Sequence, residues 1–138
     1  MAVTFRILPD RGLVYVRYVD FALIDESIQA FSAYMNHPDC RPGQKHLIDL
    51  AAVVGFERDY PRLMALQAFM ARLYVGTDIQ TMAAFFAPSR EAQEMTTPVL
   101  RSWEGHDQVV VRVLDNEAEA LAFLGLTETR IADLLANA

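Results

Sequence analysis

Residues 45–50 (KHLIDL), followed by residues 51–59 (AAVVGFERD), decide the fold of this chain. The first run is short and mostly apolar, which is typical of a central strand buried on both faces. We expect residues 51–59 to leave this strand as a loop that leads into the longest helix. From residue 60 to residue 75 the apolar side chains recur at helical spacing, with Asp59 or Tyr60 as the N-cap.

The elements on either side of this stretch follow from the same kind of pattern. Residues 3–8 and 13–19 alternate apolar and polar side chains around a Pro-Asp-Arg-Gly turn, which predicts an antiparallel hairpin. Asp25 is the expected N-cap of the first helix, which should end near His37, because Pro38 disfavours helical geometry in the residue before it. Residues 80–87 and 109–114 are predicted strands.

Helices are expected after each of the later strands. Ser89 and Asn116 are suited to cap two of them, and Thr127 is the expected cap of a last short helix. Alternating strands and helices require crossover connections, so the later strands should be parallel. The predicted fold class is α/β: one domain with a mixed, mostly parallel sheet and helices on its faces, in the order β-β-α-β-α-β-α-β-α. We place this domain at residues 1–126, and residues 127–138 form a helical extension docked on the domain or on a partner.

The net charge and the cysteine content restrict the partners and the cellular location expected for this protein. The net charge is −6 and Lys45 is the only lysine, so a phosphate backbone would be repelled and nucleic acid is not an expected partner. Cys40 is the only cysteine, which excludes an intrachain disulfide and favours a reducing, cytoplasmic location. The chain shows no signal-peptide pattern and no apolar run approaching the ~20 residues that cross a bilayer.

Three stretches of the chain resemble the STAS group, and more closely its SpoIIAA-like branch of small bacterial proteins. Residues 12–16 (GLVYV) resemble the opening strand of that family, and residues 46–50 (HLIDL) resemble its central strand. Residues 113–124 (VLDNEAEALAFL) resemble its closing strand and helix. The order and spacing of the three stretches carry the resemblance, which covers most of the chain up to Leu126.

The resemblance implies a non-enzymatic regulatory fold that acts by binding a protein partner or a second copy of itself. In the anti-sigma-factor antagonists of the group, a serine after an aspartate is phosphorylated at the start of the helix that follows the central strand. Glu57 and Arg58 stand at that place here, and residues 51–59 contain no serine or threonine. A phosphate adds about −1.5 to −2 charges at pH 7, but this stretch has no hydroxyl to accept it.

Five residues are candidates for a ligand or partner site: Asp49, Glu57, Arg58, Asp59 and Met64. Asp49 either lies near the sheet edge where α/β proteins bind ligands or accepts backbone N–H groups from the following residues. Glu57, Arg58 and Asp59 form either a partner-recognition edge or a solvated charge run, with Asp59 as a helix cap. Met64 falls off the main apolar face and, with Val75 and the C-terminal helix, forms either an exposed apolar patch or local packing.

No metal or cofactor is expected. His37, Asp39, Cys40 and His46 have ligand side chains, but their spacing matches no familiar zinc pattern. The chain also has no Gly-rich phosphate loop, G-x-S-x-G elbow or H-E-x-x-H motif.

Three hypotheses for the function remain. The first is a cytoplasmic regulatory or protein-interaction module that works through its surface and is expected to be a homodimer. The order of the elements and the lack of a nucleophile–base–orienter set favour it. The second is a carrier of an apolar small molecule or lipid, with a cavity between helix and sheet lined by Phe69, Met70, Tyr74, Phe85 and Phe86. The third is a small enzyme that uses Asp49, Glu57 or His46 as an acid or base.

Overall fold

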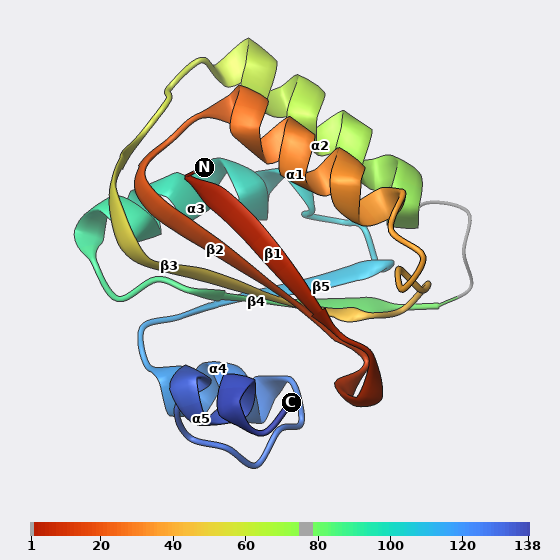
Figure 1. Ribbon diagram of the computed structural model, residues 1–138. Helices are drawn as coiled ribbons and strands as arrows, with labels where there is room; N and C mark the ends of the chain where they lie inside the picture. Colours follow the sequence, from red (N-terminus) through yellow and green to blue (C-terminus); the bar gives the residue numbers. More distant parts are fainter. Residues whose placement is uncertain (1, 75–78) are drawn as a thin grey trace.

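A mixed sheet of five strands forms the middle layer of the molecule (Figure 1). The structure, a computed structural model, describes residues 2–74 and 79–138. For residues 73 and 74 it describes the backbone but not the side chains. The strands lie in the sheet in chain order, and β1 is antiparallel to β2 while each later strand is parallel to the one before it. They are β1 (Val3–Leu8), β2 (Leu13–Ala22), β3 (Lys45–Phe56), β4 (Thr81–Phe86) and β5 (Val109–Leu114).

Helices cover both faces of this sheet (Figure 1). One face carries α1 (Ile24–Met35), α2 (Tyr60–Tyr74) and α3 (Arg90–Ser102). The other face carries α4 (Glu117–Phe123) and α5 (Ile131–Ala136). A 3-10 turn, η1 (Pro9–Arg11), closes the first hairpin. The predicted class, an α/β fold with a mostly parallel sheet, is confirmed.

Each face of the sheet has its own apolar core because side chains alternate along a strand. On β3, Leu47 belongs to the core under α4 and α5, whereas Ile48 belongs to the core under α3. Leu121 and Leu134 are fully buried in the first of these cores, so α5 packs on the same sheet as the rest of the chain.

The central position expected for residues 46–50 is confirmed, since β3 lies between β2 and β4 and these residues are all buried. The expected hairpin is present as well, with Val3 opposite Tyr18 and Leu8 opposite Leu13. Ser89 and Asn116 cap α3 and α4 as predicted, each accepting a hydrogen bond from the backbone N–H three residues later.

The prediction of a loop at residues 51–59 is wrong for most of that stretch, because β3 continues to Phe56. The neighbouring strand β2 also continues, to Ala22, and the two extensions pair from Val19 with Ala52 to Ala22 with Phe56. This pairing satisfies backbone groups on the two edges that face each other. The register shifts twice along it, and Asp20 has a positive φ of 63°.

Two predicted helix caps are also wrong. Asp25 lies in the first turn of α1, whose N-cap is Leu23, a residue without a capping side chain. The last helix begins at Ile131 rather than after Thr127, and the Glu117 carboxylate accepts a hydrogen bond from its first backbone N–H. In both helices a carboxylate from a distant segment supplies the acceptor (Glu57 for α1), which local sequence patterns do not reveal.

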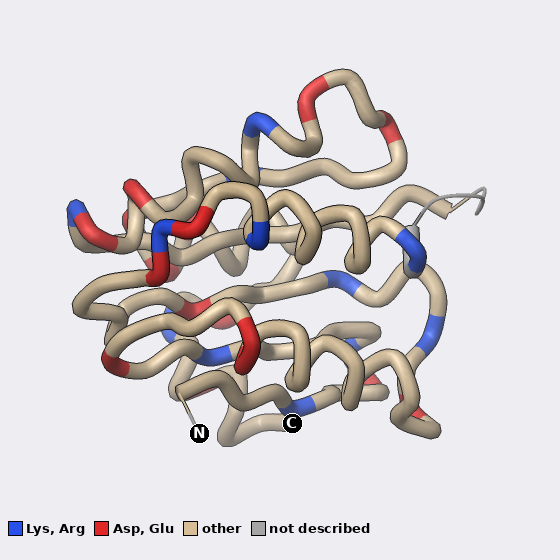
Figure 2. Tube along the Cα trace, turned by 90° about the horizontal axis from the view of Figure 1, so that it is seen from above, with Lys and Arg blue, Asp and Glu red and all other residues tan. Residues whose placement is uncertain are grey.

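Charged residues of both signs are mixed over the view in Figure 2, and at one end basic and acidic segments lie side by side. Ion pairs join α2 to α1, and the loop between β3 and α2 to both α2 and α3, as described below. In the described part of the chain, no helix is both long and apolar enough to cross a membrane.

Candidate functional site

Asp49 lies in the middle of β3, on the sheet face toward α5. Its carboxylate accepts a hydrogen bond of 2.5 Å from the Tyr15 hydroxyl and one of 3.0 Å from the Ala51 backbone N–H. Burial and the neighbouring carboxylate raise the pKa of Tyr15, which therefore stays protonated as a donor. Both carboxylate oxygens therefore accept hydrogen bonds, one from β2 and one from the backbone two residues later, as the structural interpretation of Asp49 predicts.

An open groove of about 470 Å³ adjoins this carboxylate between the sheet and α5. Arg6 and Arg17 line it together with Glu117, so charges of both signs face the groove. Arg6 donates to the carbonyl oxygen of Leu135, and Glu117 is engaged by the start of α5. The polar side chains of this groove thus help to hold α5 on the sheet.

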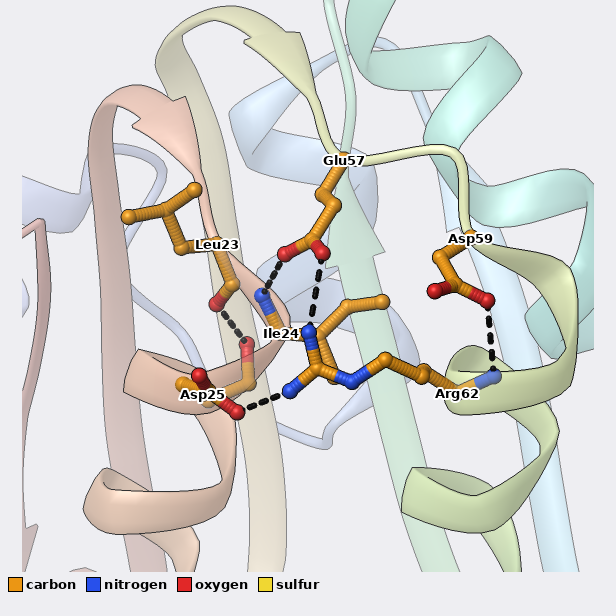
Figure 3. Close-up of polar contacts among 7 residues, drawn as sticks. Leu23, Ile24, Asp25, Glu57, Asp59 and Arg62 are labelled. Carbon is orange, nitrogen blue, oxygen red and sulfur yellow. Dashed lines mark hydrogen bonds and ion pairs between the residues drawn. The ribbon is translucent and has the colours of Figure 1, made fainter.

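Glu57 and Asp59 organise the opposite side of the sheet, where α1 and α2 begin (Figure 3). Glu57 accepts a hydrogen bond of 3.0 Å from the backbone N–H of Ile24 and pairs at 3.0 Å with Arg62. Arg62 also pairs with Asp25. Asp59 accepts a hydrogen bond of 3.2 Å from the backbone N–H of Arg62, so its predicted role as the N-cap of α2 is confirmed. Two helix starts are therefore tied together by one carboxylate and one guanidinium.

Arg58 connects the same loop to α3. Its guanidinium pairs with Glu94 at 3.0 Å and lies 4.2 Å from the ring centroid of Phe56. The ion pair lowers the pKa of Glu94. The three consecutive candidates Glu57, Arg58 and Asp59 thus contact α1, α3 and α2 respectively.

Met64 is 43% exposed on α2, and its sulfur accepts a contact of 3.8 Å from the Ser102 hydroxyl of α3. The C-terminal helix α5 lies on the other face of the sheet (Figure 1), so an apolar patch shared by Met64 and that helix is not formed. Val75, the third expected member, lies outside the described residues.

A cavity of about 110 Å³ lies between the sheet and the three helices α1, α2 and α3. Its walls come from all three helices and from the strands below them, and are mostly apolar. Leu23, one of the residues that line it, is 41% exposed. Representative lining residues are Ala30 and Phe31 of α1, Met70 of α2, Val99 of α3, and Ile48 and Phe85 of the sheet.

The expected set of cavity residues is correct in part. Met70 and Phe85 line the cavity. Phe86 belongs to the core on the opposite face. Phe69 packs edge-to-face against Phe31, with ring centroids 6.0 Å apart. The side chain of Tyr74 lies outside the described residues.

Several polar groups are buried in the cavity wall. His46 is 4% exposed, and burial lowers its pKa to about 4, so it is neutral at pH 7. Its ring meets that of Tyr34 edge-on at 5.6 Å, and the Tyr34 hydroxyl donates to Gln44 at 2.6 Å. Tyr18 and Ser27 form a hydrogen bond of 2.9 Å. These contacts make the wall polar at a few defined points.

Gln67 and Trp103 form a further polar point that sequence analysis did not find. Gln67 is 7% exposed on α2 and accepts a hydrogen bond of 3.1 Å from the indole N–H of Trp103. Both residues line the cavity. The sequence carried one signal of this contact: a glutamine that interrupts the apolar stripe on the buried face of the predicted helix.

Metal ligands do not gather in the described part of the chain, where no group of three or more His, Cys, Asp or Glu side chains is placed to hold an ion. His37 accepts a hydrogen bond of 3.0 Å from the Asp39 backbone N–H, whereas His46 lies in the cavity wall. Comparison of the sequence with protein-family models and with curated proteins finds no match.

Proposed function

We propose that this protein is a non-enzymatic binding module that holds a small apolar molecule between its sheet and the helices α1, α2 and α3. The cavity of about 110 Å³ is the observation that carries this proposal. Folded proteins are packed as densely as organic crystals and have few voids larger than a water molecule. Engineered apolar cavities of roughly 150 Å³ bind benzene or xenon, so a cavity of the present size is in the range of a small ligand.

Walls that face unfilled space also lack the van der Waals contacts of a packed core. A ligand that fills the void regains van der Waals contacts with the walls. Apolar walls with a few buried polar groups are also the usual composition of a small-molecule site.

The kinship with STAS and SpoIIAA-like proteins remains part of this proposal. It is supported by the element order, a hairpin followed by three helix–strand repeats and a closing helix. The loop after β3 has structural contacts and no hydroxyl group for phosphorylation, so we propose regulation through ligand occupancy instead. The single cysteine supports a cytoplasmic location.

A second function, binding of a protein partner or of a second copy of the chain, is favoured by exposed apolar residues where β2 and β3 end. We call Phe21, Leu23, Val54 and Tyr60 the tip surface. Val54 is 70% exposed, and the Phe21 ring packs over Gly55. Clustered exposed apolar side chains often mark interfaces.

The cavity proposal is tested with toluene and xenon as probes. Trp103 is the only tryptophan and lines the cavity, so its fluorescence should change saturably when toluene binds. Bound toluene should also raise the melting temperature, by about 2–5 °C at ten times the dissociation constant. Xenon should appear in the same place in crystals under gas pressure.

A matched pair of variants on α1 provides the control. Ala30→Leu places a larger side chain in the cavity wall and should weaken toluene binding at least about tenfold. Ala33→Leu makes the same change at an exposed position of the same helix and should leave binding unchanged. A folded wild-type protein that takes up neither toluene nor xenon would contradict the proposal.

A further inference from the structure

The charges around the cavity restrict the ligand it can hold. Among the described residues that line the cavity, Glu57 is the one acidic side chain, and lysine and arginine are absent. Both oxygens of Glu57 are engaged, one by Ile24 and the other by Arg62. A ligand carboxylate or phosphate would therefore lose its hydration without gaining a cationic partner, which is strongly unfavourable.

The Gln67 side chain restricts the hydrogen-bonding groups of the ligand. The indole N–H of Trp103 can only donate, so the atom of Gln67 that faces it must be the carbonyl oxygen Oε1. This contact fixes the orientation of the amide, and the other end is the NH₂ group with two donors. Within residues 2–74 and 79–138, the fully buried side-chain polar atom without a hydrogen-bond partner is Glu26 Oε2, so the NH₂ group of Gln67, which no protein acceptor engages there, stays accessible to water in the cavity.

In the ligand-free protein, water in the cavity can accept from this NH₂ group. Because Gln67 lines the cavity, an acceptor on a bound molecule is placed to replace that water. The polar residues elsewhere in the wall already have partners, such as Gln44 for Tyr34 and the Gln93 carbonyl for Thr96. The Gln67 amide is thus the position at which the cavity wall can recognise a ligand oxygen.

The rings in the wall indicate the rest of the ligand. Phe5, Phe31 and His46 each present an edge or face close to Tyr34, with centroids 5.6–6.0 Å apart. Aromatic rings prefer edge-to-face or offset contacts with other rings. The volume of about 110 Å³ is below the roughly 150 Å³ of an engineered cavity that binds benzene, so it limits the ligand to a single small ring.

Building on the proposed cavity function, we propose that the ligand is an uncharged, single-ring aromatic compound with an oxygen acceptor that receives a hydrogen bond from Gln67 Nε2. This assigns a ligand class to the cavity and a recognition role to Gln67. The rings and apolar walls bind the body of the molecule, and the amide selects the oxygen.

The test compares three probes of similar size: acetophenone, ethylbenzene, which lacks the oxygen, and benzoate, which is charged. Dissociation constants are measured by calorimetry at pH 7.5 for the wild type and for Gln67→Leu. Gln67→Leu should weaken acetophenone binding by about fivefold or more and leave ethylbenzene binding unchanged or tighter. Benzoate should bind the wild type at least about a hundredfold more weakly than acetophenone.

Two controls separate recognition from folding. Gln29→Leu makes the same substitution at an exposed position of α1 and should change none of the three constants. In the wild-type protein, the NMR signals of the Gln67 side-chain NH₂ should move toward hydrogen-bonded values with acetophenone but not with ethylbenzene. This second measurement keeps the proposal testable if Gln67→Leu does not fold.

The outcomes distinguish the two proposals. If acetophenone and ethylbenzene both bind but Gln67→Leu affects them equally, or if benzoate binds as tightly as acetophenone, the proposed ligand class is wrong and the cavity function stands. If none of the three probes binds and xenon and toluene are also excluded, the cavity function itself fails.

Discussion

His46 illustrates how one residue on the central strand acquires its properties from the helices above it. From the sequence alone, His46 was a candidate metal ligand or general base. In the folded protein it lies 4% exposed between sheet and α1, and burial lowers its pKa to about 4. A buried neutral imidazole makes the free energy of unfolding depend on pH.

The sign of this dependence follows from the two pKa values. In the unfolded chain an imidazole has a pKa of about 6.5, so the unfolded state takes up the proton first as the pH falls. The contribution of His46 is therefore fully present above about pH 6.5 and is lost progressively down to about pH 4. Between pH 7.5 and pH 4.5 the expected loss is about 2–3 kcal/mol.

Urea unfolding across this pH range tests the prediction. The His46→Gln variant should lose less stability than the wild type as the pH falls, by most of that amount. His106→Gln, at an exposed histidine, should follow the wild-type curve. Identical pH dependence in wild type and His46→Gln would show that His46 is not the titrating group.

At the scale of elements, the start of α1 depends on a side chain from another segment. The N-cap residue Leu23 has no side-chain acceptor, and Glu57 from the loop after β3 accepts the Ile24 backbone N–H instead (Figure 3). This carboxylate also lies near the positive end of the helix dipole. Glu57 also pairs with Arg62, so it holds the starts of α1 and α2 together at the cavity wall.

We expect Glu57→Ala to lower the free energy of unfolding by about 1–2 kcal/mol, as the loss of a helix cap does. Glu57→Gln keeps an acceptor and should cost less than half as much. Asp25→Ala removes only an exposed partner of Arg62 and should stay within about 0.5 kcal/mol of the wild type. Chemical denaturation measures all three, and equal effects of Glu57→Ala and Asp25→Ala would exclude the capping role.

At the scale of the whole molecule, the tip surface lies where β2 and β3 end, and one of its members, Leu23, also lines the cavity. A partner seated on this surface would contact Leu23 from outside, while a bound ligand would contact it from the cavity. Ligand binding and partner binding would then be coupled, because each changes the surface that the other contacts.

If the partner is a second copy of the chain, the wild-type protein should sediment as a dimer at micromolar concentration. Val54→Lys would place a charge in that interface and should raise the dimer dissociation constant at least about tenfold. Ala33→Lys, which adds the same charge at an exposed position on α1, should not. Analytical ultracentrifugation measures this, and a wild-type monomer at all concentrations would exclude self-association through the tip surface.

Local patterns in the sequence were sufficient to predict most of the fold. Side-chain alternation identified the hairpin, helical spacing identified α2, and side-chain chemistry identified the caps Asp59, Ser89 and Asn116. These signals are short-range, because the interacting groups are only a few residues apart. The central place of β3 followed from the order of the elements.

Tertiary structure alone decided the candidate site. The extension of β3 to Phe56 depends on pairing with β2, and the cap of α1 depends on Glu57, 33 positions from Ile24 along the chain. The cavity is a difference between the volume enclosed by the sheet and α1, α2 and α3 and the volume of the side chains that fill it. An apolar pattern specifies which residues face inward, but only their packing in three dimensions determines whether space for a ligand remains.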